Sequence, residues 1–132
     1  MAQKPSKLIE MSKKILVVDD SAIILKLITV ILGKSGYEVK HAIDGREALH
    51  QLDGRDFDLL ITDLNMPYVD GISLTKEVRK MECYSSVPIV MLTSESRSSV
   101  KTQAVAAGVT SYIVKPFVVP TFLALIDQLL NG

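Results

Sequence analysis

Five side chains that could take part in chemistry each follow a short apolar run of the sequence. The runs ILVV, LLIT, IVML and YIV are followed, in turn, by Asp19 with Asp20, by Asp63, by Thr93 and by Lys115. Each residue alone could be structural, because strands commonly end in polar residues and Asp commonly begins a turn. Three acids, a hydroxyl and an ammonium in equivalent places instead indicate one reactive site.

The charges of these side chains indicate what else the site would need. Two carboxylates 4 Å apart repel by about 4 kcal/mol at an effective dielectric constant near 20. Lys115 offsets one negative charge, and a divalent cation would offset the remainder. Ligands that are all oxygen, without His or Cys, favour Mg²⁺, with Mn²⁺ as a substitute. The cation and Lys115 would draw charge from a phosphoryl group while Thr93 donates a hydrogen bond, so the set predicts phosphoryl transfer to an aspartate.

The elements that must position these residues are predicted from the spacing of apolar residues. Runs without alternation indicate strands buried on both faces, as in a parallel sheet. They cover residues 15–18, 59–62, 89–92 and 112–114, and a weaker run at 37–42 suggests an edge strand.

Between the runs the apolar spacing is helical. It predicts helices at residues 23–32, 45–52, 72–81, 100–107 and 120–130. Gly33 or Gly36 is expected to end the first helix, and Gly54 and Gly108 to stop two others. Alternating strands and helices imply a three-layer α/β domain whose functional crevice lies at the carboxyl ends of the strands.

The composition restricts the classes of protein to consider. A chain of 132 residues suits one domain, and 15 Lys plus Arg balance 15 Asp plus Glu, so we expect binding to neither nucleic acid nor an anionic membrane. No apolar stretch reaches the roughly 20 residues of a membrane helix, and no secretion signal is recognised at the N-terminus. Cys83 is the only cysteine, which excludes an internal disulfide and fits a cytoplasmic protein. Residues 1–13 are expected to be an N-terminal extension, and residues 14–132 the domain.

Four motifs, taken in order, resemble one family closely. VVDDS (17–21), ITDLNMPYVDG (61–71), MLTSES (91–96) and YIVKPF (112–117) are similar to the receiver domain of bacterial two-component response regulators, particularly the single-domain CheY-like type of chemotaxis. The resemblance spans residues 14–132. It implies a doubly wound (βα)5 parallel sheet of the flavodoxin/CheY-like kind, with strand order 2-1-3-4-5.

The resemblance also implies a role for each site residue. Asp63 would accept a phosphoryl group from the phosphohistidine of a sensor histidine kinase or a histidine phosphotransfer protein. Asp20 and Asp63 would bind Mg²⁺ directly, Asp19 through water and Asn65 through its backbone carbonyl. Lys115 would contact the phosphoryl group. The chain would then be no enzyme in the ordinary sense, since it would catalyse only its own phosphorylation and dephosphorylation.

The resemblance also implies which positions transmit the signal and which set the lifetime of the phosphoryl group. Thr93 would move toward the phosphoryl group and Tyr112 would turn inward, changing the face formed by the fourth helix, the fifth strand and the fifth helix. Asn65, Ser94 and Glu95 would tune the lifetime of the phosphoryl group. A downstream protein would bind that face. The peptide between Lys115 and Pro116 would be cis, as is typical of the family.

The last helical segment is unusually apolar for a helix with one solvated face. Some of its large side chains are expected to remain exposed, namely among Val118, Val119, Phe122, Leu125 and Leu129. An exposed apolar patch often marks an interaction surface, so this helix is expected to serve partner docking or self-association, in a monomer or weak dimer.

Other functions remain open at this point. The chain could be a phosphate sink or relay intermediate without an output of its own. A haloacid-dehalogenase-like phosphatase also forms an aspartyl phosphate, but it needs a second Asp where this chain has Asn65. A flavodoxin-like cofactor binder is disfavoured by the lack of a glycine-rich phosphate loop. His41 and His50 follow no strand of the site, so the phosphohistidine is expected on another protein.

Overall fold

The computed structural model describes residues 12–54 and 57–132. The proposed extension at residues 1–13 therefore lies almost wholly outside the described residues. The strands are β1 (Lys14–Val18), β2 (Glu38–Ala42), β3 (Leu59–Thr62), β4 (Ile89–Thr93) and β5 (Ser111–Val114). The helices are α2 (Ala22–Lys34), α3 (Gly45–Gln51), α4 (Gly71–Lys80), the short 3-10 helix η1 (Glu82–Tyr84), α5 (Ser98–Ala107) and α6 (Val119–Asn131).

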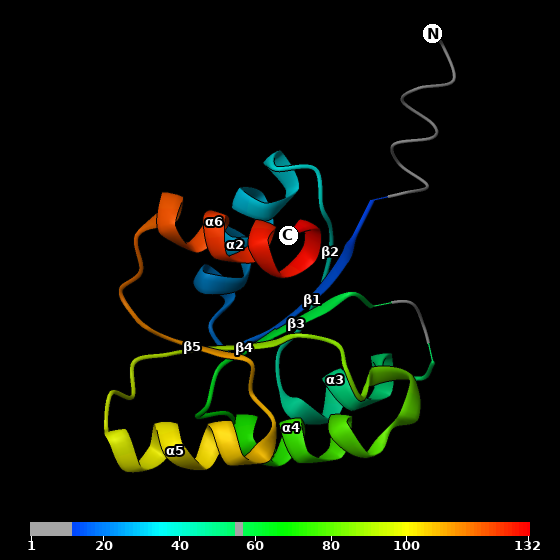
Figure 1. Cartoon of the computed structure of the whole chain (residues 1–132), viewed down its shortest axis with the longest axis vertical. Helices are drawn as coiled ribbons and strands as arrows, with labels where there is room; N and C mark the ends of the chain where they lie inside the picture. The colour runs from blue at the N-terminus through cyan, green and yellow to red at the C-terminus, as the bar shows by residue number, and fades with distance from the viewer. Residues whose placement is uncertain (1–11, 55–56) are drawn as a thin grey trace, which may run out of the picture.

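The strands form one parallel sheet in the order β2-β1-β3-β4-β5, which confirms the expected topology. α2 and α6 cover one face of the sheet and α3, α4 and α5 cover the other (Figure 1). Each face has its own apolar core, because neighbouring residues of a strand point to opposite sides. Leu16 and Val18 belong to the core under α4, whereas Ile15 and Val17 pack with Ile28 under α2 and α6.

The prediction that the last run is buried on both faces is wrong. β5 pairs only with β4, so it is an edge strand of the sheet. Ser111, Tyr112 and Ile113 are half-buried and Val114 is exposed. A short apolar run is compatible with an edge when helices cover part of its surface, and periodicity over so few residues does not separate the two cases.

One of the expected glycine stops, Gly54, lies elsewhere than predicted. Gly33 lies inside α2, which continues to Lys34, and it is Gly36, with a φ of 95°, that follows the helix end. α3 ends at Gln51 with Leu52 as its cap, so Gly54 lies beyond the helix. Gly108 does end α5 as predicted, with a φ of 120° that suits only glycine.

The apolar last helix is only partly exposed. Val118 and Val119 are 64% and 38% exposed, as expected for a patch on this helix. Phe122, another residue named for this patch, is buried, and its ring packs against that of Phe117 with centroids 4.9 Å apart. Separately, no helix among residues 12–54 and 57–132 is long and apolar enough to cross a bilayer.

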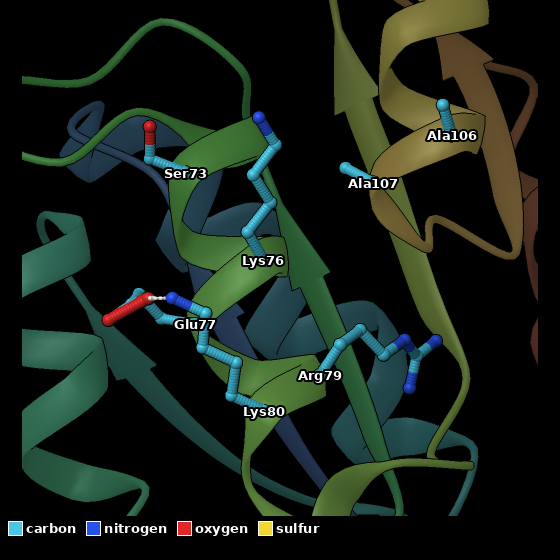
Figure 2. Close-up of a pocket in the computed structure, with 7 residues that line it drawn as sticks. All are labelled: Ser73, Lys76, Glu77, Arg79, Lys80, Ala106 and Ala107. Carbon is cyan, nitrogen blue, oxygen red and sulfur yellow. Dashed lines mark hydrogen bonds and ion pairs between the residues drawn. The ribbon is translucent and has the colours of Figure 1, made fainter.

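Arg79 ties the C-terminal end of α4 to three other segments. Its guanidinium donates to the backbone carbonyls of Gly108, Tyr84, Ser85 and Val87 at distances of 2.7 to 3.2 Å. Figure 2 shows this side chain extending from α4 away from the ion pair of Glu77 and Lys80. The planar fork of an arginine suits several carbonyls at once, which a lysine would not match.

Replacing Arg79 with Ala is therefore expected to lower the free energy of unfolding by about 3 kcal/mol, because several carbonyls lose a charged donor together. Urea unfolding followed by circular dichroism measures the change. Lys76→Ala is the matched control, since this exposed residue lies on the same helix. Lys76 and Arg79 both line a groove between α4 and α5. Equal stabilities of the two variants would contradict the assigned role of Arg79.

Candidate functional site

Three carboxylates meet at the carboxyl ends of β1 and β3. Because β1 and β3 are neighbours in the sheet, Asp19, Asp20 and Asp63 each place one carboxylate oxygen so that all three lie within 4.8 Å of one another. Asp19 is 3% exposed, Asp63 is intermediate and Asp20 is exposed. The cluster is thus open to solvent on the side of Asp20.

Lys115 reaches this cluster from the end of β5. Its Nζ lies 2.9 Å from Oδ2 of Asp19 and 3.4 Å from Oδ2 of Asp63. Burial disfavours the ammonium, but the hydrogen bond to Asp19 and the charges of both acids outweigh it and raise the pKa of Lys115. Lys115 therefore stays protonated and bridges two of the three acids.

Asp19 is the acid most removed from water. Its burial raises the pKa of its carboxyl, against the opposing effects of the Ser21 N–H and of Lys115. The Ser21 N–H donates to Oδ1 at 2.9 Å, and the Ser21 hydroxyl caps α2 by accepting from the N–H of Ile24 at 3.3 Å. The start of α2 thus holds Asp19 in place from one side while Lys115 holds it from the other.

Asp63 is positioned by the loop that follows it. The N–H of Leu64 donates to Oδ1 of Asp63 at 2.6 Å, and the carbonyl of Leu64 accepts from the N–H of Gly71 at 2.8 Å. α4 begins at Gly71, where a Cβ would overlap the backbone carbonyl oxygen of Asp63. Asp70 caps α4 by accepting from the N–H of Ser73 at 2.7 Å. The sequence therefore needs glycine at 71 so that α4 can start against the acid.

Thr93 and Lys115 are joined through the backbone. The N–H of Lys115 donates to the carbonyl of Thr93 at 2.8 Å, so the ends of β4 and β5 stay in register. Thr93 is fully buried, and its hydroxyl accepts from the N–H of Glu95 at 3.3 Å. The peptide between Lys115 and Pro116 is cis, as predicted.

Tyr112 is linked to the loop after β4. Its hydroxyl donates to the backbone carbonyl of Glu95 at 2.7 Å. Burial, and then the charges of Glu95 and Asp63, raise the pKa of Tyr112. Arg97, a residue that the motifs did not single out, donates from Nε to Oε1 of Glu95 at 2.9 Å and lowers the pKa of that carboxyl. The only signal for Arg97 in the sequence was an opposite charge two positions away.

The remaining predicted residues lie around this centre. Asn65 lies in the loop between Asp63 and α4, and Ser94 follows β4; both are exposed. His41 lies on β2 and His50 on α3, both exposed and neither at the strand ends that hold the acids. The structure thus brings Asp19, Asp63 and Lys115 into direct contact and leaves both histidines outside the cluster.

The donor set of the cluster fits a hard divalent cation. Three carboxylate oxygens within 4.8 Å carry more negative charge than one ammonium can offset, and no His or Cys is among them. Mg²⁺ prefers a few carboxylates and keeps several waters, which suits a cluster with one exposed member.

Comparisons with known proteins agree with this geometry. Residues 15–127 match the model of the response regulator receiver domain. The chain is 44% identical to the chemotaxis protein CheY1 of Helicobacter pylori over 79% of this chain and 86% of that protein. Chemotaxis protein CheY4 of Vibrio cholerae has a solved structure that superimposes with a TM-score of 0.86 at 40% identity, covering 90% of this chain and 99% of that one.

A third solved structure bears on the acidic cluster. The receiver domain of a Pseudomonas aeruginosa sensor histidine kinase, 27% identical with a TM-score of 0.84, covers 92% of this chain and 99% of its own, and it holds a magnesium ion in its active-site cleft. From the matched family model, the relatives and the shared strand order, we conclude that this chain belongs to the response regulator receiver domain family of two-component signalling and is CheY-like.

Proposed function

We propose that the chain accepts a phosphoryl group on Asp63 from the phosphohistidine of a sensor histidine kinase or histidine phosphotransfer protein, and signals by binding another protein in that state. The observation that carries the proposal is the position of Lys115, whose ammonium lies within 3.4 Å of both Asp19 and Asp63 beside a third acid. A fixed positive charge next to a partly exposed carboxylate is what a phosphoryl acceptor needs.

In the proposed transfer Asp63 is the nucleophile and the donor imidazole is the leaving group. A carboxylate oxygen of Asp63 attacks phosphorus, the P–N bond to the donor imidazole breaks, and the imidazole leaves with its electron pair and takes a proton. Lys115 stabilises the charge on the phosphoryl oxygens, and the hydroxyl of Thr93 donates a hydrogen bond to one of them. The N–H of Leu64 already holds Oδ1 of Asp63 at 2.6 Å, which leaves Oδ2, the oxygen facing Lys115, as the nucleophile.

The proposed metal ligands are the carboxylates of Asp19, Asp20 and Asp63 and the backbone carbonyl of Asn65. Mg²⁺, or Mn²⁺ in its place, would supply positive charge that offsets the phosphoryl oxygens. The donor set and the magnesium ion in the related Pseudomonas aeruginosa receiver support this choice. In this assignment the chain catalyses only its own phosphorylation and dephosphorylation.

The proposed output surface is the face of α5, β5 and α6. Tyr112 lies on β5, and Val114, Val118 and Val119 nearby are exposed. Movement of Thr93 toward a bound phosphoryl group would act on the Glu95 loop, whose carbonyl holds the Tyr112 hydroxyl. We infer that a downstream protein binds here and that self-association is weak or absent. Asn65, Ser94 and Glu95 are proposed to tune the phosphoryl lifetime.

We infer that residues 14–132 form the receiver domain, that residues 1–13 precede it as an extension, and that the protein acts in the cytoplasm.

The alternative of a phosphate sink or relay intermediate shares the same site chemistry and differs only in having no output surface. The exposed Val114 and Val118 favour a surface with a partner. A phosphatase of the haloacid-dehalogenase kind is disfavoured because residue 65 is Asn.

The test is labelling by a small phosphodonor. Incubation of the purified protein with acetyl phosphate and Mg²⁺ is expected to add one phosphoryl group, seen by intact-protein mass. Asp63→Asn should take none, because an amide is a poor nucleophile. The matched control is Asp127→Asn, an exposed acid on α6 that should label like the wild type. Persistent labelling of Asp63→Asn would overturn the assignment of the acceptor.

A further inference from the structure

The loop between Asp63 and α4 contains a strained backbone turn at Tyr68. Tyr68 has a φ of 70°, and the N–H of Val69 donates to the carbonyl of Pro67 at 2.8 Å. This is the rarer and more strained form of γ-turn, with a central φ near about +75°. Tyr68 is the one non-glycine residue with positive φ among residues 12–54 and 57–132. Glycine would adopt this φ without strain, so the tyrosine ring must offset its cost by what it contacts.

The ring of Tyr68 is 72% exposed, so burial does not explain the strain. The ring lies against Arg46 in the first turn of α3, whose guanidinium carbon is 3.8 Å from the ring centroid. Gly45, which precedes Arg46, also lies against Val69, which follows Tyr68. A Cβ added at Gly45 would lie 2.7 Å from Cβ of Val69. The start of α3 therefore holds the turn at two adjacent points.

A short series of hydrogen bonds connects this turn to the acid. The loop from Leu64 to Gly71 is closed by the bond between the Leu64 carbonyl and the Gly71 N–H, at 2.8 Å. The same residue, Leu64, donates its N–H to Oδ1 of Asp63 at 2.6 Å. The conformation of the closed loop thus sets the direction of the N–H that orients the carboxylate.

From these contacts we propose that Arg46 and Tyr68 are positioning residues, which clamp the loop 64–71 to α3 and so hold Asp63 and the neighbouring Asn65 carbonyl in the geometry that receives Mg²⁺. The inference rests on the proposed function of the acidic cluster. Neither residue touches the acids, and their effect passes through the loop. Strain retained at an exposed position next to a reactive group is consistent with such a role.

The experiment measures Mg²⁺ binding by isothermal titration calorimetry, with the metal alone as the probe. Arg46→Ala is expected to weaken binding roughly two- to fivefold, the range that one exposed cation–π contact can supply. Removing a positive charge from the protein would by itself favour binding of a cation, so a weakening of Mg²⁺ binding reports the loss of positioning. Tyr68→Phe keeps the ring and should bind like the wild type.

The control for a general loss of structure is a double-mutant cycle. Tyr68→Gly relieves the φ strain but removes the ring, so it should weaken Mg²⁺ binding without lowering the melting temperature, and Arg46→Ala should cause no further weakening in that background. Wild-type affinity in Arg46→Ala, or an equal weakening in both backgrounds, would overturn the clamp. If the wild type binds no Mg²⁺, the proposed function fails instead, and the clamp fails with it.

Discussion

Replacement of Lys115 with Met is expected to slow the labelling of Asp63 by acetyl phosphate about a hundredfold, the usual cost of removing one group that stabilises charge in the transition state. Met keeps most of the apolar stem while losing the ammonium that lies 2.9 Å from Asp19 and 3.4 Å from Asp63. The initial rate of mass increase at saturating Mg²⁺ measures the effect.

The same variant should bind Mg²⁺ more tightly than the wild type. Lys115 and a metal ion both offset the charge of the three acids, so removal of the ammonium leaves more negative charge for the cation. This opposite direction separates the role of Lys115 in charge stabilisation from damage to the site, which would weaken both properties. Lys101→Met, at an exposed position on α5, is the control for the substitution itself. A Lys115→Met protein that labels at the rate of Lys101→Met would contradict the proposed mechanism.

Gly71→Ala is expected to destabilise the fold by about 3 kcal/mol, at the upper end of the cost of overpacking. The added Cβ would overlap the backbone carbonyl oxygen of Asp63 and lie 2.9 Å from Cε of Met91. The methionine can move, but the carbonyl belongs to the backbone at the end of β3 and is held there by the Thr62 hydroxyl at 2.8 Å. Chemical unfolding measures the loss, and slower labelling of Asp63 should accompany it.

Gly33→Ala provides a matched comparison in another helix. Gly33 lies inside α2, and a Cβ there would meet no atom within 4 Å. The change should therefore stabilise the fold by about 0.5–1 kcal/mol, because Gly is a poor helix former. If the two substitutions changed stability equally, the close approach of α4 to Asp63 would not be the cause of the loss at Gly71.

The position of the site could be predicted because it depends on a general property of parallel sheets. All strands point the same way, so residues that follow them meet at one edge, and Asp19, Asp63 and Lys115 do so. The strand order could not be predicted in this way, because the spacing of apolar residues does not tell which strands are neighbours. It came from the family resemblance, and that order places β5 at the edge of the sheet, whereas the spacing of its apolar residues does not.

The contacts that the sequence did not reveal are mainly those made by loops and by backbone groups. Arg79 binds four carbonyls, and a backbone carbonyl carries no mark in the sequence. Tyr68 occupies a conformation that a non-glycine residue rarely adopts, so propensity argues against it. Arg97 meets Glu95 because the chain turns before α5, and charge spacing alone does not predict such a turn.

The position of β1 between β2 and β3 also affects how the chain reaches its folded state. β1 pairs with β2 on one side, where Lys14 faces Glu38, and with β3 on the other, where Ile15 faces Leu59. During synthesis β2 emerges before β3, so β1 can pair with β2 early while its other edge is still unpaired. Its unpaired N–H and C=O groups could pair with another chain during that interval. Because every strand pairing joins segments separated by a helix, folding of this sheet should be limited by non-local pairing and sensitive to protein concentration.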